Sequence, residues 1–198
     1  MKSAAPRREG NLKERIDRAA LHLFAERGAD ATPVPMIAEA AGVAVGSLYR
    51  YYANKDEMVT RLYAENYAEL AAMLDRAQAA ETGAQAKLGA MIHFICGFFD
   101  REWDIARFLL LEQHARLRDY AGPANPVDVV GQVVADGIAA GEIEPIAPLV
   151  AVALVMGPVV QAATFRTYGR FNGTLGESAD DIAAAVWAAL TSGPRGAP

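Results

Sequence analysis

Two short helical patterns separated by a glycine constrain the fold of this chain more than any other feature. The first extends from Thr32 to about Ala41, and Gly42 follows it as a helix stop. The second extends from about Ala44 to Tyr52. Two short helices joined by a tight turn that contains glycine predict a helix-turn-helix motif. A structural corner between two packed helices is the alternative interpretation of the same pattern.

Helical periodicity continues through the rest of the chain, and no segment alternates apolar and polar residues as a half-buried strand does. The Thr32-Pro33 pair is typical of an N-cap followed by proline at the first helical position. Asn54, with Glu57 three residues later, resembles a capping box. Further helices are expected over residues 11–27, 54–81, 84–100, 103–118, 127–140, 147–169 and 179–191. The sequence therefore predicts an all-α fold of about nine helices.

The sequence pattern divides the chain into three parts. Residues 1–10 are polar and basic and are expected to form a flexible tail, residues 11–57 contain the helix-turn-helix, and residues 58–198 form a larger helical domain. Residues 1–60 carry nine Lys and Arg against eight Asp and Glu, while the whole chain has a net charge of −5. Total charge therefore gives no argument for general nucleic-acid binding, so any such contact has to come from local geometry.

Secreted and membrane proteins are disfavoured. Cys96 is the only cysteine, so no intrachain disulfide is possible, and its apolar neighbours indicate a small buried side chain. The N-terminus lacks the apolar run of a signal peptide. The longest apolar stretch, residues 146–160, is interrupted by Pro148 and Gly157-Pro158 and is shorter than the roughly 20 residues of a membrane span. We therefore expect a cytoplasmic protein.

An enzyme is also disfavoured. His22, His93 and His114 have no Ser, Cys or carboxylate partner at the spacing of a known catalytic motif. Zinc-protease, nucleophile-elbow, CxxC and phosphate-loop motifs are absent from the sequence. We expect no catalytic residue, no cofactor and no metal site.

Helical periodicity sorts the aromatic residues of the second short helix. Leu48 and Tyr52 are four residues apart and share one face, which we expect to be buried. Tyr49 and Arg50 are rotated away from that face and point largely outward. Tyr51 lies at the boundary. The outward surface of this helix is therefore expected to carry large polar side chains.

This outward surface combines groups that hold phosphates with residues that permit close approach. Hydroxyl, guanidinium and ammonium groups and the N–H groups at helix N-termini all bind phosphate oxygens. Small residues let a helix approach a base-pair edge closely. The polar groups belong to Ser47, Tyr49, Arg50 and Lys55, and the small residues are Ala44, Val45 and Gly46.

Two longer runs carry a family resemblance. With their relative spacing, LFAERGADATPVPMIAEAAGV and GSLYRYYANKDEM make residues 12–62 similar to the DNA-binding domain of the tetracycline-repressor (TetR) family of bacterial regulators. The remainder of the chain has the length and helical character of that family's effector-binding and dimerisation domain. The resemblance implies a transcriptional regulator, expected to be a repressor, that binds a palindromic operator as a homodimer and is released by a small apolar or aromatic effector.

The resemblance also implies a role for individual residues. The second short helix would enter the major groove, where Ser47 faces bases or the adjacent backbone and Tyr49 contacts phosphate. Arg50 would reach phosphate or a base edge, and Thr32 and Lys55 would hold phosphates at the starts of their helices. The full set of implied DNA contacts is Thr32, Pro33, Ala44, Val45, Gly46, Ser47, Tyr49, Arg50, Tyr51 and Lys55.

The chain departs from the family pattern at Ala44-Val45, where a small polar residue and a longer polar or basic residue are usual. The apolar side chain of Val45 could contact a thymine methyl group. The resemblance therefore does not imply an operator sequence.

The resemblance assigns dimerisation to the last two helices, 147–169 and 179–191, whose apolar stripes are equally typical of an intrachain core. An effector pocket needs bulky apolar residues with a few polar groups among them. Pro158 tends to kink its helix and leave room for a ligand, although aromatic stripes are also typical of ordinary packing. The candidate effector residues are Met91, Phe94, Phe98, Trp103, Phe108, Leu111, His114, Met156, Gln161, Phe165 and Tyr168.

The alternative function is a helical protein–protein adaptor that retains the helix-turn-helix fold without reading DNA. Such an adaptor would show no salt-dependent binding to duplex DNA.

Overall fold

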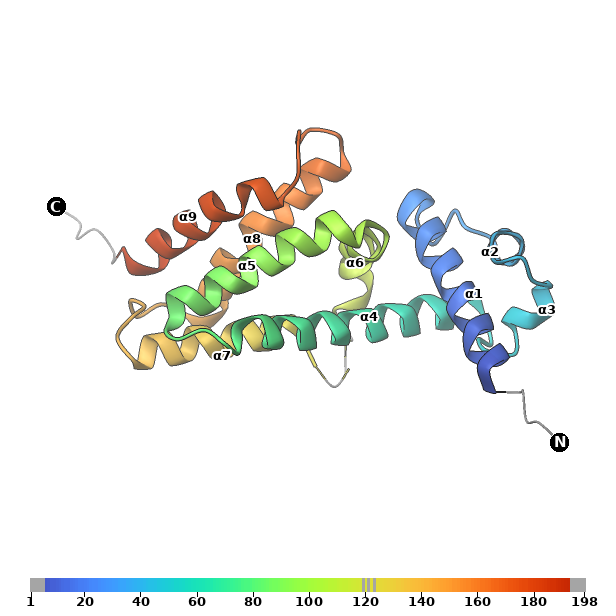
Figure 1. Ribbon diagram of the computed structural model, residues 1–198, viewed down its shortest axis with the longest axis horizontal. Helices are drawn as coiled ribbons and strands as arrows, with labels where there is room; N and C mark the ends of the chain where they lie inside the picture. Colours follow the sequence, from blue (N-terminus) through green and yellow to red (C-terminus); the bar gives the residue numbers. More distant parts are fainter. Residues whose placement is uncertain (1–5, 119, 121, 123, 193–198) are drawn as a thin grey trace. The chain divides into compact units, whose positions relative to one another are not determined.

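The computed structural model describes residues 6–118, 120, 122 and 124–192, with side chains described from Leu12 onward. In this part of the chain all regular structure is helical, which confirms the predicted all-α fold of about nine helices (Figure 1). The elements are α1 (Pro6–Arg27), α2 (Val34–Ala41), α3 (Val45–Leu48), α4 (Lys55–Gln78), α5 (Ala84–Arg101), α6 (Trp103–Arg116), α7 (Pro126–Ala139), α8 (Pro148–Thr167), the 3₁₀ turn η1 (Gly176–Ser178) and α9 (Ala179–Thr191).

Most helices begin and end within a few residues of the predicted positions, and two differ. Helix α1 begins at Pro6, so residues 6–10 are helical where a flexible tail was expected; residues 1–5 lie outside the described part of the chain. Helix α3 ends at Leu48, although the second short helix was predicted to continue to Tyr52. The backbone N–H of Tyr51 donates to the carbonyl oxygen of Leu48 at 2.9 Å. This bond joins residues three apart, as in a turn, and not four apart as in an α-helix.

The chain forms two compact units. Unit 1 comprises the described residues of 1–66 and 104–121, and unit 2 comprises those of 67–103 and 122–198. Helix α4 contributes to both units, and nearly all of α6 belongs to unit 1. The functional boundary expected after residue 57 remains a prediction.

Three aromatic rings form the centre of unit 1. Phe108 of α6 stacks on Phe24 of α1 with ring centroids 5.7 Å apart, and it meets Tyr63 of α4 edge-on at 6.3 Å. All three side chains are buried. Such pairs add roughly 0.5–1.5 kcal/mol beyond the area that they bury. Helix α6 is therefore part of the core that supports the helix-turn-helix.

Helix α2 lies between a proline start and a glycine stop. Its N-cap residue is Pro33, so the prediction that Thr32 caps this helix is wrong. The hydroxyl of Thr32 instead donates to the carbonyl oxygen of Gly28 at 2.8 Å, a local alternative open to threonine. Gly42 ends the helix with φ 64°, where a side chain would be strained and would also lie 3.0 Å from the guanidinium of Arg15.

The start of α4 confirms the predicted capping box. The side-chain oxygen of Asn54 accepts from the N–H of Glu57 at 2.8 Å. The Glu57 carboxylate in turn accepts from the N–H of Ala53 at 2.6 Å. The N–H of Glu57 is one that a helix N-terminus leaves without a partner in the helix, and the N–H of Ala53 lies just before it. The two bonds together fix where the segment after α3 ends and α4 begins.

Helix α5 is the central element of unit 2. It packs against α7, α8 and α9, and α8 in turn packs against α7 and α9 (Figure 1). Cys96 is buried in this packing, as predicted. Burial raises the pKa of its thiol to about 11, so the thiol stays protonated and unreactive.

The carboxylate of Asp100 joins the end of α5 to the end of α8 and to the turn before α9. One oxygen accepts from the guanidinium of Arg166 and from the N–H of Leu175 at 3.1 Å, and the other accepts from the N–H of Gly176 at 2.8 Å. The Arg166 guanidinium also lies 4.8 Å from the centroid of the Trp103 ring, which is a cation–π distance. Unit 2 therefore has a charged contact at this end of its helices.

Helix α8 is, among the described residues, the one helix long and apolar enough to cross a membrane by length and composition alone. Its most apolar window has mean hydropathy 1.8, and 33% of that window is buried inside the protein. The apolar stretch of residues 146–160 considered in the sequence covers only part of this helix, which has 20 residues. A single helix of this kind is a weak indication, because core helices have the same composition.

Candidate nucleic-acid interface

Helix α3 is one turn long, and its two sides differ in burial. Leu48 and Tyr52 are 1% and 2% exposed, whereas Val45 and Tyr49 are 37% and 54% exposed. Arg50 is also exposed. The predicted inward direction of Leu48 and Tyr52 and the outward direction of Tyr49 and Arg50 are therefore confirmed. The exposed residues Val45, Tyr49 and Arg50 are therefore the starting point for this site.

Small residues surround Val45 on the exposed side of α3. Ala44 and Gly46 are exposed, and Ser47 is half-buried. A Cβ atom placed on Gly46 would meet no atom within 4 Å, so packing within the chain does not require glycine there. Glycine destabilises a helix by roughly 0.5–1 kcal/mol relative to alanine. The missing side chain at this position therefore favours close approach by another molecule.

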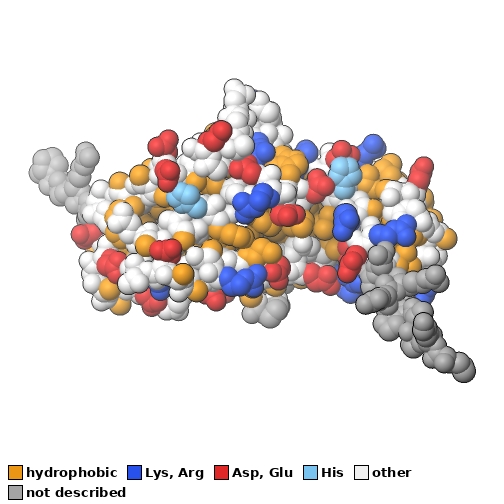
Figure 2. Space-filling model, viewed as in Figure 1, with side chains coloured by type: hydrophobic (Ala, Val, Ile, Leu, Met, Phe, Trp, Pro, Cys, Tyr) orange, Lys and Arg blue, Asp and Glu red, His pale blue; other side chains and the backbone are white. Residues whose placement is uncertain are grey.

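Basic and acidic side chains are interspersed on the face of the protein drawn in Figure 2, which has no large region of one sign. This distribution agrees with the net charge of −5. Long-range electrostatic attraction is therefore a poor basis for nucleic-acid binding by this chain. Any contact with nucleic acid would therefore depend on the groups around α3.

Two residues predicted to hold phosphates make hydrogen bonds inside unit 1. Thr32 is 0% exposed, because its hydroxyl donates inward to the turn after α1. The side-chain nitrogen of Lys55 donates to the carbonyl oxygens of Ala29 at 2.7 Å and Asp30 at 3.2 Å. An ammonium group has three donors, so Lys55 retains one for another acceptor. Pro33, next to Thr32, is exposed at the start of α2.

Asp17 and Arg61, neither of which was a predicted site residue, hold residues 51 and 52 at the end of the segment after α3. The hydroxyl of Tyr52 donates to Asp17 of α1 at 2.6 Å, and the guanidinium of Arg61 of α4 donates to the carbonyl oxygen of Tyr51 at 2.9 Å. Burial raises the pKa of Tyr52, and its hydrogen bond to Asp17 raises it further. No sequence signal pairs Asp17 with Tyr52, because the two residues belong to separate helical patterns.

Charged contacts also connect α6 with α1 and with α4 inside unit 1. Nδ1 of His22 lies 2.9 Å from the carboxylate of Asp104, and Nε2 lies 3.6 Å from that of Glu26. The hydrogen bond with Asp104 raises the pKa of His22. Near the other end of α6, the guanidinium of Arg116 donates to the carboxylate of Asp56 at 2.8 Å. Helix α6 is therefore tied at both ends to elements of the helix-turn-helix unit.

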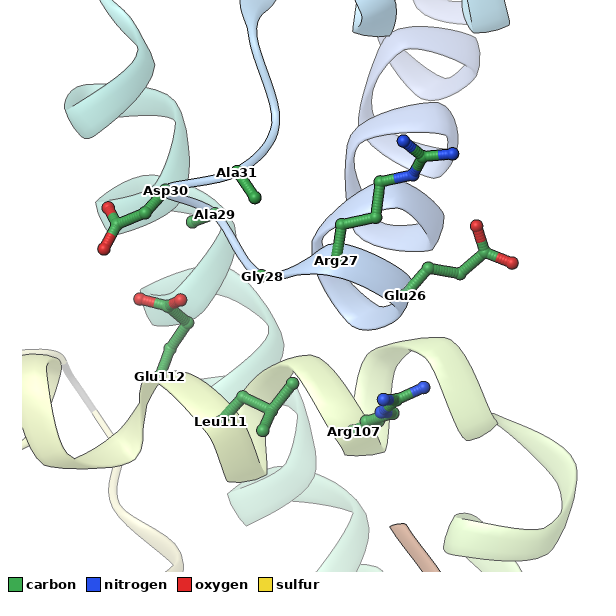
Figure 3. Close-up of a pocket in the computed structure, with 9 residues that line it drawn as sticks. All are labelled: Glu26, Arg27, Gly28, Ala29, Asp30, Ala31, Arg107, Leu111 and Glu112. Atoms are coloured by element: carbon green, nitrogen blue, oxygen red, sulfur yellow. The ribbon is translucent and has the colours of Figure 1, made fainter. Parts of the chain in front are cut away.

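A cavity of about 430 Å³ lies in unit 1 between the turn after α1 and helix α6 (Figure 3). Leu111 points into it from α6, and Glu112 points from the same helix toward Ala29 and Asp30 (Figure 3). The other lining residues are Glu26, Arg27, Gly28, Ala31 and Arg107. Of the predicted effector residues only Leu111 lines this cavity, so it is not the pocket that the sequence analysis expected.

The predicted effector residues lie in both units. Those of unit 1 are Phe108, which is buried in the core, and Leu111 and His114, which are exposed. In unit 2, Met91 and Phe98 are buried, and Phe94 lies beside Phe98 with ring centroids 6.2 Å apart. The remaining members are half-buried Trp103 and Met156 and exposed Gln161, Phe165 and Tyr168.

Metal chemistry has no candidate site in the parts of the chain that the structure describes. These residues contain no group of three or more His, Cys, Asp or Glu side chains arranged to hold a metal ion.

Comparison with known proteins places the helix-turn-helix in a family. A sequence model of bacterial regulatory proteins of the tetR family matches residues 16–62. An HTH-type transcriptional repressor, KstR2 of Mycobacterium tuberculosis, is 49% identical over 55 residues, which cover 28% of this chain and 26% of the repressor. This chain therefore matches about a quarter of the length of that relative.

Two further relatives match beyond the helix-turn-helix. The fatty acid metabolism regulator protein of Bacillus subtilis is 28% identical over 131 residues, which cover 64% of this chain and 68% of the regulator. The crystal structure of the transcriptional regulator FadR from Bacillus subtilis, in complex with stearoyl-CoA, has a TM-score of 0.71 at 19% identity, covering 88% of this chain and 97% of FadR. At that identity the structural likeness concerns the fold alone.

Proposed function

Because this chain belongs, through residues 16–62, to the TetR family of bacterial regulatory proteins, we propose that it is a ligand-responsive transcriptional repressor. It binds a palindromic operator as a homodimer and leaves the operator when a small apolar effector binds. It acts in the cytoplasm and is not an enzyme.

The observation that carries this proposal is the outward placement of Tyr49 and Arg50 on an element whose other side is buried. The ring of Tyr49 is 54% exposed and lies next to Arg50 in the sequence, so its apolar surface is not used in the core. Its hydroxyl and the guanidinium of Arg50 are groups that bind phosphates and base edges. Exposed Ala44, Val45 and Gly46 leave room for that surface to enter a groove. Each contact in the set has a separate chemical role.

Backbone contacts position the protein, and base contacts specify the sequence. Ser47, Tyr49 and the free donor of Lys55 contact phosphates, and Arg50 contacts phosphate or a base edge. Thr32 is left out of the proposed contacts, because its hydroxyl donates to the carbonyl oxygen of Gly28 and its backbone N–H donates to that of Ala29 at 3.2 Å. Val45 lies against a thymine methyl group, which is the apolar feature of the major groove.

Dimerisation uses α8 and α9. Residues that are apolar or small, apart from Gln161, recur along the exposed side of α8 at intervals of three or four and make a helical stripe. The exposed residues of that stripe are Val150, Ala153, Gly157, Gln161, Phe165 and Tyr168, and the exposed alanines of α9 are Ala184, Ala185, Ala188 and Ala189. Small residues on two adjacent helices allow the same helices of a second copy to pack closely. The resulting two-fold symmetry matches two half-sites about 34 Å apart.

The effector has a large apolar part, and a long-chain acyl-CoA, whose acyl chain is apolar although its CoA moiety is charged, is the first to test. The relative from Bacillus subtilis that matches 64% of this chain is named for fatty acid metabolism. In unit 2 the predicted effector residues away from the exposed stripe are apolar or aromatic: Met91, Phe94, Phe98, Trp103 and Met156. Binding of the effector favours a conformer whose two recognition segments no longer match the half-sites, so the operator is released.

The test is selection of genomic fragments by the purified protein at physiological salt, followed by sequencing. We expect an enriched palindrome with half-sites about one helical turn apart, bound with an affinity that falls steeply with salt. Tyr49→Ala with Arg50→Ala abolishes retention, whereas Arg76→Ala, which removes an exposed ion pair with Glu69 far along α4, leaves it unchanged.

Stearoyl-CoA added to the operator complex releases the DNA, and an apolar compound without the acyl chain does not. Retention without a motif, or no retention, contradicts the proposal and favours the adaptor function. Motif binding that no acyl-CoA alters contradicts only the proposed effector.

A further inference from the structure

The recognition element is too short to hold its own direction. Helix α3 has four residues, and helices of one turn are unstable in isolation because nucleation is unfavourable. Tyr49 and Arg50 follow this single turn in a segment without regular helix. How the residues on either side are anchored therefore affects the direction of both.

Anchors lie on both sides of the exposed pair in the sequence. Leu48, immediately before it, is 1% exposed and belongs to the core of unit 1. The carbonyl oxygen of Tyr51, immediately after it, accepts from Arg61 at 2.9 Å. Two consecutive exposed residues between fixed neighbours have little freedom to change direction. The anchor at Tyr51 therefore depends on a charged side chain, whereas the anchor at Leu48 depends on apolar packing.

The ionic anchor is a cluster around Tyr52, here called the Tyr52 cage and made of Lys13, Asp17, Tyr52, Arg61 and Glu65. One oxygen of Asp17 accepts from the Tyr52 hydroxyl at 2.6 Å, and the other accepts from Lys13 at 2.7 Å. Lys13 Nζ and Arg61 Cζ lie 5.6 Å and 4.9 Å from the centroid of the Tyr52 ring. Both distances are within the cation–π range.

Glu65 closes the cage by approaching both cations. Its carboxylate lies 3.5 Å from the side-chain nitrogen of Lys13 and 3.7 Å from the guanidinium of Arg61. The cage thus draws one cation from α1 and one from α4 to a single buried ring. A ring needs no such cage to be buried, since Phe24 and Phe108 in the same unit pack without charged partners of this kind.

We propose that the Tyr52 cage is the positioning device of the DNA interface, in which Asp17 and Arg61 fix the direction of Tyr49 and Arg50 although neither touches DNA. This inference rests on the proposed function for its effect on DNA, and on geometry alone for its effect on the recognition turn. The cage affects specificity for the operator sequence more than overall affinity for DNA, because none of its charged side chains is among the proposed phosphate contacts.

Tyr52→Phe is the test variant, because it removes the hydroxyl and keeps the ring. Tyr67→Phe is its matched control, because the Tyr67 hydroxyl also donates to a side chain, that of Asn125 at 3.2 Å, inside unit 2. Backbone ¹⁵N relaxation of the free protein reports the order of residues 49–51. We expect their order parameters to fall from about 0.85 toward 0.6 in Tyr52→Phe and in Asp17→Asn, and to stay unchanged in Tyr67→Phe.

Binding to the operator and to a scrambled duplex then separates positioning from stability. We expect Tyr52→Phe to bind the operator about tenfold more weakly, with the same salt slope as wild type because the same phosphates are held. Affinity for the scrambled duplex stays within twofold of the wild-type value.

The inference is overturned if the order parameters of residues 49–51 are unchanged in Tyr52→Phe and in Asp17→Asn. It is also overturned if folded Tyr52→Phe binds the operator with wild-type affinity. If order falls but the wild-type protein binds no duplex, the proposed function is refuted and the positioning of the turn stands.

Discussion

The side-chain nitrogen of Lys55 lies 2.7 Å from the carbonyl oxygen of Ala29, so the first residue of α4 is tied to the turn between α1 and α2. We expect Lys55→Met to lower the free energy of unfolding by about 1 kcal/mol, because charged hydrogen bonds to two carbonyls are lost. Urea denaturation measures this loss. Lys87→Met, in unit 2, is the matched control and should change stability by less than half as much.

The same variant tests the proposed phosphate contact of Lys55. Each lost phosphate contact reduces the slope of log affinity against log salt by about 0.9. We expect that reduction for Lys55→Met. An unchanged slope with reduced stability would show that Lys55 serves only the turn.

Gly46→Ala should change stability and DNA binding in opposite directions. A Cβ at this position meets open space, and alanine favours a helix over glycine, so the free energy of unfolding should rise by about 0.5–1 kcal/mol. Operator affinity should fall at least tenfold, because the methyl group occupies the closest approach to the base pairs. Thermal unfolding and fluorescence anisotropy measure the two effects.

Gly89→Ala in α5 is the control for this pair of effects. A Cβ there also meets no atom within 4 Å, and the residue lies in unit 2. It should raise stability by a similar amount and leave operator affinity as it is. A Gly46→Ala protein that is more stable and binds as tightly as wild type would remove the argument for close approach.

The contact between His22 and Asp104 makes stability depend on pH. The pKa of His22 is raised above its unfolded value near 6.5, so this contribution is fully present below that value and is lost as pH rises through the folded pKa. Wild type should therefore exceed His22→Gln in Tm by more at about pH 5.5 than at about pH 8.5. The difference is small and best measured at low salt, because both side chains are about half exposed.

Ala153→Arg should dissociate the dimer without unfolding the chain. Ala153 is exposed near the start of the α8 stripe, so a long cation there is solvated in the monomer and desolvated in the proposed dimer. Sedimentation velocity should give a dimer for wild type and a monomer for the variant. The control Ala135→Arg, at an exposed position on α7, should remain dimeric. A dimeric Ala153→Arg protein would place the interface elsewhere.

Local patterns in the sequence predicted much of the fold, because residues three and four apart form one face of a helix and their apolar repeat marks where the helix begins and ends. Helices α5, α6, α8 and α9 all begin and end within two residues of the predicted positions. The burial of Leu48 and Tyr52 followed from their spacing. Periodicity indicates which face of a helix is buried but not what covers it.

That limit explains what the sequence did not predict. The hydrogen bond from Tyr52 to Asp17 joins residues 35 positions apart, and no local pattern selects this carboxylate over its neighbours. Phe108 was assigned to an effector site from its apolar spacing, and the structure places it in the core of unit 1. Thr32 had two local options, a cap or a bond to the preceding turn, and its sequence context favours both.

Unit 1 is formed by two separate stretches of the sequence, and this limits how it can be transferred to another protein. Phe108 reaches the ring of Phe24 from a segment that the chain enters only after residues 67–103 have passed through unit 2. A fragment ending at residue 66 would leave the faces of Phe24 and Tyr63 that Phe108 covers open to water. A chimera designed to carry the proposed DNA interface therefore has to include residues 104–121 along with the first 66.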